Sequence, residues 1–149
     1  ASAGGIERDE ETDEDLLMIF APGSSLGGAR PKASVVDADG ALAIAKFPKP
    51  ADDYSVEAWE HVALTLAALA GIRTPQHELH DVAGKRVLIS WRFDRMGSTR
   101  IPFLSAMSML GAKDGERASY PEIVDALSKH GAEAKSDAEE LFRRMIFNI

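Results

Sequence analysis

Residues 24–32 read Ser-Ser-Leu-Gly-Gly-Ala-Arg-Pro-Lys, and the rest of the chain is interpreted outward from them. The adjacent Gly27 and Gly28 allow backbone angles that other residues avoid, so the main chain can bring its N–H groups against a bound oxyanion. Arg30 and Lys32 add positive charge, which suits a phosphate group. A flexible turn before a strand has the same composition and remains the alternative. A P-loop is excluded because Lys32 lies between proline and alanine.

The next candidate is Lys46, on a predicted strand. Residues 33–36 and 41–47 have the pattern of two strands, joined by a tight hairpin at residues 37–40. Alternation places Lys46 on one strand face with two aliphatic side chains, so it either reaches water at a sheet edge or holds a bound group. The phosphate-type loop upstream favours the second interpretation. In kinases, a strand lysine of this kind holds nucleotide phosphates and is oriented by a helix glutamate.

A candidate for that glutamate lies on the strongest predicted helix, residues 53–70, which a glycine and then a proline follow. Glu60 projects from a largely apolar stripe, where a carboxylate is costly to bury unless a cation pairs with it. Glu57 lies beside His61 in less apolar surroundings and is the weaker candidate. A solvent-exposed Glu60 with no partner is the remaining alternative.

A second hairpin is predicted from residues 76–82 and 86–91, with alternating core positions on the later strand. Residues 92–97 then change character, from an apolar strand to charged residues and a glycine. We expect Asp94 to brace a neighbouring arginine or the backbone and to take no part in catalysis.

Residues 103–149 are predicted to be helical. A short helix that includes Phe103 ends at Gly111. Capping-box spacing begins a second helix at Ser119 and, where it recurs, a last helix at Ser136. The predicted core positions of the last helix are Leu141, Met145 and Ile146.

Composition narrows the possible functions. The chain of 149 residues has a net charge of −7, which argues against a general nucleic-acid binder. It has no cysteine, no basic and apolar leader, and no apolar run long enough to span a membrane, so we expect a cytoplasmic location. The histidines are too scattered to predict a metal site. Residues 1–11 are predicted to be an acidic, flexible tail.

Four motifs, in order along the chain, resemble HipA-type serine/threonine kinases, the toxins of bacterial toxin–antitoxin pairs. The motifs are residues 23–32, 43–48, 92–95 and 141–148. The resemblance implies an α+β fold with a kinase-like ATP-binding lobe at residues 12–97, in which an antiparallel sheet packs with one long helix. It implies that residues 98–149 are the helical start of a catalytic lobe, truncated here.

The resemblance also assigns roles to individual residues. Glu60, rather than Glu57, takes the position that orients Lys46, and Ser25 is autophosphorylated in a way that silences the kinase, although Ser24 is adjacent. The hinge that faces adenine would use the Trp91 carbonyl and the Phe93 amide. The residues assigned to ATP binding are Gly27, Gly28, Ala29, Arg30, Lys32, Lys46, Glu60, Trp91 and Phe93.

The groups that perform phosphoryl transfer are expected beyond this chain. In the resembled family the catalytic loop follows the Phe-Asn that occurs here just before Ile149. We therefore expect a fragment with no catalytic residue of its own, with Mg²⁺ ligands outside it. The expected partners are ATP, a protein substrate and a helix-turn-helix antitoxin, with no direct nucleic-acid or membrane contact. The alternative is a non-catalytic interaction or regulatory domain that keeps the kinase-like fold.

Overall fold

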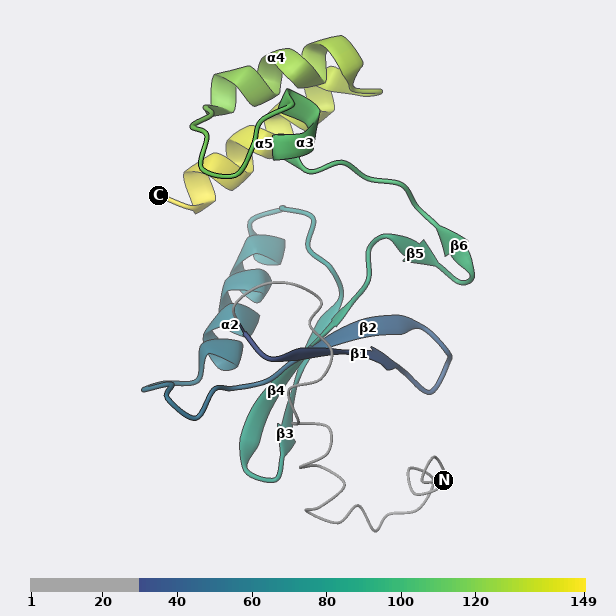
Figure 1. Cartoon of the computed structure of the whole chain (residues 1–149), viewed down its shortest axis with the longest axis vertical. Coiled ribbons are helices and arrows are strands. Elements are labelled where there is room, and N and C mark those ends of the chain that lie inside the picture. Colours follow the sequence, from purple (N-terminus) through teal and green to yellow (C-terminus); the bar gives the residue numbers. More distant parts are fainter. Residues whose placement is uncertain (1–29) are drawn as a thin grey trace.

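The computed structural model describes residues 30–149. In this part of the chain an antiparallel sheet and four helices form a mixed fold, which confirms the α+β part of the prediction (Figure 1). The strands are β1 (Lys32–Val36), β2 (Leu42–Lys46), β3 (His77–Val82), β4 (Lys85–Trp91), β5 (Arg95–Met96) and β6 (Thr99–Arg100). The helices are α2 (Val56–Leu69), α3 (Ala106–Leu110), α4 (Tyr120–His130) and α5 (Ala134–Phe147).

Two hairpins build the main sheet, in the order β1-β2-β4-β3. The first hairpin turns because the Asp37 carboxylate accepts hydrogen bonds from the main-chain N–H groups of Asp39 and Ala41, at 3.0 and 2.8 Å. Gly40 completes this turn with φ +82°, a conformation that glycine adopts without strain. Both hairpins agree with the sequence prediction to within about a residue at each strand end.

The two faces of this sheet are covered to different extents. One face carries a buried cluster of Ala45, Phe47 and Val87. Lys46 and Leu88 lie opposite each other on the other face, and Leu88 is fully buried. Helix α2 packs against β3 and β4 (Figure 1). The ion pair of Lys46 with Glu60 on α2 shows that the helix lies on this second face. The sheet therefore presents its lysine toward the helix.

The observed starts of α2 and α5 differ from the predicted ones. Helix α2 begins after Ser55, whose side chain accepts a hydrogen bond from the Ala58 N–H, so its start lies later than predicted. Helix α4 begins after the predicted cap, Ser119, and ends at His130 as expected. Helix α5 begins at Ala134, so the prediction that Ser136 starts it is wrong. Capping-box spacing alone does not identify the first residue of a helix.

Helices α3, α4 and α5 form a group of their own, joined to the sheet through β5 and β6 (Figure 1). Leu141 and Met145 on α5 are half-buried and border an apolar groove between α4 and α5. Ile146 is 53% exposed, so its predicted place in the core is wrong for the described residues. No helix in residues 30–149 is long and apolar enough to span a membrane.

Burial predicts which leucines stabilise the fold. Leu88→Ala removes a side chain with no exposed surface, so we expect the free energy of unfolding to fall by about 2–5 kcal/mol. The matched control is Leu69→Ala on α2, where the leucine is 80% exposed and the change should stay within about 0.5 kcal/mol. Urea denaturation of both variants measures these changes. Equal losses for the two variants would contradict this account of the core.

Candidate functional site

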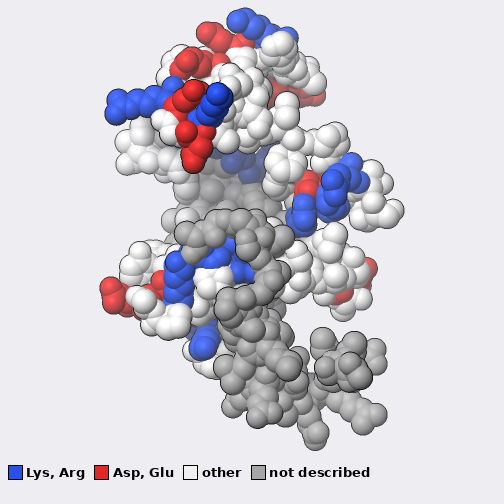
Figure 2. Space-filling view, viewed as in Figure 1, with Lys and Arg blue, Asp and Glu red and all other residues white. Residues whose placement is uncertain are grey.

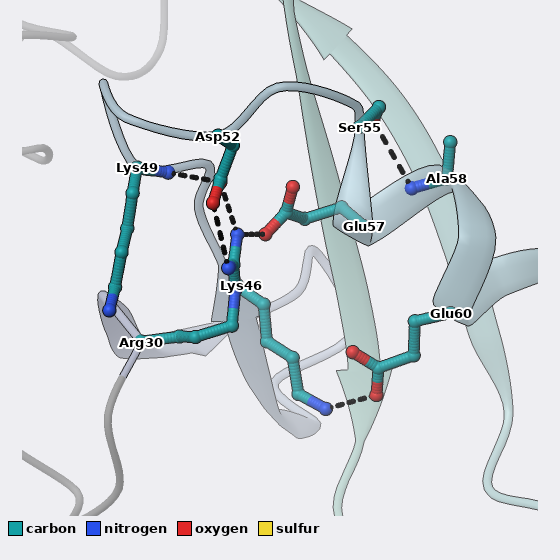
Figure 3. Close-up of polar contacts among 8 residues, drawn as sticks. All are labelled: Arg30, Lys46, Lys49, Asp52, Ser55, Glu57, Ala58 and Glu60. Atoms are coloured by element: carbon teal, nitrogen blue, oxygen red, sulfur yellow. Dashed lines mark hydrogen bonds and ion pairs between the residues drawn. The ribbon is translucent and has the colours of Figure 1, made fainter.

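Lys46 and Glu60 form an ion pair between the sheet and α2 (Figure 3). Lys46 is the last residue of β2, and Glu60 projects from the second turn of α2. Their side chains are 29% and 34% exposed, so the pair is open to solvent on one side. The structure thus brings together the two residues that the sequence singled out, and it leaves part of each side chain exposed to solvent.

Lys32 lies directly opposite Lys46 across the β1–β2 ladder. Side chains at such paired positions project from the same face of a sheet, and like charges placed there destabilise it. Glu60 supplies one neutralising charge for the two lysines. The pair of lysines therefore creates a position at which a bound anion would be favourable.

Arg30 makes a second link between this region and α2. Its guanidinium donates to both carboxylate oxygens of Asp52, at 3.0 and 2.5 Å, and to Glu57 Oε1 at 2.8 Å (Figure 3). The hydrogen bonds to Asp52 and then to Glu57 raise the pKa of Arg30. The Arg30 guanidinium, followed by the Lys49 N–H, lowers the pKa of Asp52 below its usual value. These contacts hold the end of the glycine-rich stretch against the start of α2.

Glu57 corrects one step of the sequence argument. The prediction placed Glu57 in the less apolar surroundings, yet it is 1% exposed, whereas the Glu60 side chain is 34% exposed. Glu57 can be buried because Arg30, far away in the sequence, pairs with it. The same contact occupies the guanidinium that was predicted to hold a phosphate.

The predicted hinge residues border a cavity of about 370 Å³. Trp91 donates its main-chain N–H to the Gln76 carbonyl at 2.9 Å and its indole N–H to Asp37 at 2.6 Å. The indole hydrogen bond is the main cause that lowers the pKa of Asp37. Phe93 is 64% exposed and its ring meets that of Phe103 edge to face. Residues that line the cavity include Leu42, Thr74, Pro75, Gln76, Trp91 and Phe93.

Asp94 braces the segment that follows β4, as the sequence predicted. Its buried carboxylate accepts hydrogen bonds from Arg92 Nε and from a terminal nitrogen of each arginine, Arg92 and Arg95, at 2.6–2.7 Å. The Arg92 guanidinium is the main cause that lowers the Asp94 pKa to about 2. Figure 2 shows basic side chains gathered beside this carboxylate-containing segment, over β5 and β6.

The sequence analysis missed a link between the sheet region and α5. Glu140, which is 8% exposed, accepts a hydrogen bond from the Arg73 N–H at 3.0 Å. Arg144 donates to Glu140 at 2.8 Å and to the Arg73 carbonyl at 2.6 Å. Burial opposes ionisation of Glu140, but these hydrogen bonds outweigh it, so its pKa is lowered. The local sequence signals only the part of this link within α5, because Glu140 and Arg144 are four residues apart and can pair on one face of a helix.

The remaining residues of the predicted nucleotide site belong to the glycine-rich stretch. Ser24, Ser25, Gly27, Gly28 and Ala29 lie outside the described residues. Within residues 30–149, no group of histidine and carboxylate side chains has the arrangement of a metal site.

The dependence of folding stability on pH in the acidic range should show the contribution of the Asp94 ion pairs. A carboxyl whose pKa is lowered on folding stabilises the protein above its ordinary value of 3.8, and this stabilisation is lost as the pH falls toward about 2. Asp94→Asn should therefore lower the urea midpoint at neutral pH. The difference from wild type should shrink across that acidic interval. Asp114→Asn, at an exposed loop position, is the control, and a pH-independent difference for Asp94→Asn would contradict this reading.

A comparison with protein families identifies the chain. A family model described as the HipA-like C-terminal domain matches residues 24–149, a span that includes Arg30, Lys46, Glu60 and the α3–α5 helices. No curated protein matches the chain. Because the matched span covers most of the sequence, the chain belongs to the HipA-like C-terminal domain family.

Proposed function

We propose that this chain is the ATP-binding part of a HipA-like serine/threonine protein kinase. The observation that carries the proposal is the ion pair between Lys46 on β2 and Glu60 on α2. In kinases, a lysine on a sheet strand holds the nucleotide phosphates, and a helix glutamate keeps that lysine in place. Membership of the HipA-like family supports the same assignment.

The charges around Lys46 favour a triphosphate. Lys32 and Lys46 face the same side of the sheet, and the one carboxylate paired there leaves an excess of positive charge. Nearby on this face, Leu42 and Ile44 are half-buried and Val36 is 61% exposed. A partly covered apolar surface beside two ammonium groups suits a ligand with an aromatic base and a polyanionic tail.

The position of the proposed hinge supports adenine as that base. Strand β4 lies beside β2 in the sheet, so the chain leaves β4 close to the start of the strand that carries Lys46. The cavity bordered by Trp91 and Phe93 lies at this end. We propose that the Trp91 carbonyl and the Phe93 N–H bind the edge of adenine, while Lys46 and the glycine-rich residues Gly27, Gly28 and Ala29 hold the phosphates.

The catalytic groups are proposed to come from elsewhere in the full-length protein. Phosphoryl transfer requires a catalytic aspartate, an asparagine and a metal-binding aspartate. We propose that Mg²⁺ arrives with ATP and that its protein ligands, like the catalytic groups, are not supplied by this chain. In this proposal residues 12–97 form the ATP-binding lobe and residues 98–149 begin the catalytic lobe.

The proposed reaction is phosphorylation of a serine or threonine hydroxyl on a protein substrate. A toxin–antitoxin role in the cytoplasm, with a helix-turn-helix antitoxin as partner, is part of the proposal and is based on the resemblance to HipA-type toxins. The rival function is a non-catalytic interaction domain with the same fold. ATP affinity separates the two, because only the kinase requires Lys46 to hold phosphates.

Calorimetry tests the nucleotide site directly. Lys46→Ala in the full-length protein should weaken Mg-ATP binding by about 1.5–3 kcal/mol, because a hydrogen bond from a charged donor is lost. Lys129→Ala, on the last turn of α4, removes an equal charge from an exposed position and should leave affinity unchanged. Equal affinity of wild type and Lys46→Ala would remove Lys46 from the site. Absence of ATP binding by the wild type would favour the interaction domain.

Autophosphorylation provides a separate test of the kinase reading. A phosphate on Ser25 would repel the nucleotide phosphates and compete for the same N–H donors, so we expect modification there to accompany loss of activity. Mass spectrometry of active full-length protein incubated with ATP should find this phosphate, and Ser25→Ala should abolish it. Modification at Ser24 alone would transfer the regulatory role to that residue. Modification at neither serine would contradict this prediction.

A further inference from the structure

Arg30 differs from Lys46 because its guanidinium donates three hydrogen bonds to two carboxylates, whereas Lys46 pairs with Glu60. It bridges Asp52, which precedes α2, and Glu57, in the first turn of α2. The Glu57 side chain is almost fully buried, and its Oε2 and the Arg30 Nε are both buried without a hydrogen-bond partner among the described residues. A charged cluster of this kind is costly to desolvate and is not explained by stability alone.

The place of this cluster relative to Lys46 suggests what it does. Arg30 lies just ahead of Lys32, the residue opposite Lys46 in the sheet. Glu57 lies one helical turn before Glu60. The two contacts, Arg30 with Glu57 and Lys46 with Glu60, therefore connect the same stretch of sheet to the same face of α2 at successive turns (Figure 3).

Two such connections constrain α2 more than one does. With Glu60 alone held, α2 could still pivot about the contact with Lys46. With Glu57 also held, the start of α2 keeps a fixed position relative to the strand that follows the glycine-rich stretch. Any displacement of Arg30 would then be transmitted through Glu57 to Glu60 and hence to the Lys46 ammonium.

We propose that Arg30 is a positioning residue, which ties the end of the glycine-rich stretch to α2 and so fixes the Lys46–Glu60 pair for nucleotide binding. This inference rests on the proposed function at the same site. It replaces the sequence-based role of Arg30 as a phosphate ligand, because three of its hydrogen bonds go to Asp52 and Glu57. Lys32 and Lys46 then remain the candidate phosphate ligands of this sheet face.

The two possible roles of Arg30 predict opposite effects of Glu57→Gln on Mg-ATP affinity. If Arg30 positions α2, then Arg30→Met and Glu57→Gln break the same link, and each should weaken Mg-ATP binding by about tenfold. The double variant should then be no weaker than either single variant, because the two residues act through one contact. If Arg30 instead binds phosphate, Glu57→Gln removes one of the two carboxylates that compete for the guanidinium and should preserve or tighten binding.

The experiment is calorimetry of Mg-ATP with the full-length protein and these variants. Arg117→Met is the matched control, because Arg117 is exposed in the loop that precedes α4. Asp52→Asn weakens the contacts of Arg30 but keeps its pair with Glu57, so the loss of Mg-ATP affinity should be smaller than for Arg30→Met. Equal affinity of wild type and Arg30→Met, or additive losses in the double variant, would overturn the proposal.

Thermal unfolding with and without Mg-ATP separates positioning from a purely structural role. A structural role would lower the melting temperature of Arg30→Met yet leave the rise caused by ATP unchanged. Positioning predicts that this ATP-induced rise itself becomes smaller, as it does for Glu57→Gln. Failure of the wild type to bind ATP would refute the proposed function, whereas normal ATP binding by both wild type and Arg30→Met would refute this inference alone.

Discussion

The contact between Lys46 and Glu60 is the interaction on which the functional account depends. It joins the last residue of a short strand to a helix that follows it in sequence, so it holds only if the hairpins and α2 pack as they do. The sheet places Lys32 opposite Lys46 in the β1–β2 ladder. The fold thereby places two lysines on one partly open face, which is the physical basis for the proposed phosphate site.

Two further links extend this arrangement beyond the sheet. Arg30 holds the start of α2 through Glu57, and Glu140 holds the loop after α2 through the Arg73 N–H. The helix that carries Glu60 is therefore restrained at both ends, from different parts of the chain. Its position relative to Lys46 is determined by contacts that no single segment contains.

The sequence predicted features that depend on local patterns. Alternation and helical spacing were enough for the strands of the main sheet and for α2. The pairing of Glu60 with Lys46 was predicted from the apolar neighbours of Glu60 together with the resemblance to the kinase family. The burial of Glu57 could not be predicted, because it requires Arg30, 27 residues away in the sequence. The start of α5 was placed wrongly because the spacing at Ser136 is also compatible with an interior helix position.

The most direct measurement is a crystal structure of the full-length protein with Mg²⁺ and a non-hydrolysable ATP analogue. The account predicts phosphate oxygens within hydrogen-bonding distance of Lys46 while its ion pair with Glu60 persists. It also predicts the adenine edge against the main chain at Trp91 and Phe93, with Arg30 still bound to Glu57. A nucleotide bound elsewhere, or phosphates that make no contact with Lys46, would contradict the central claim.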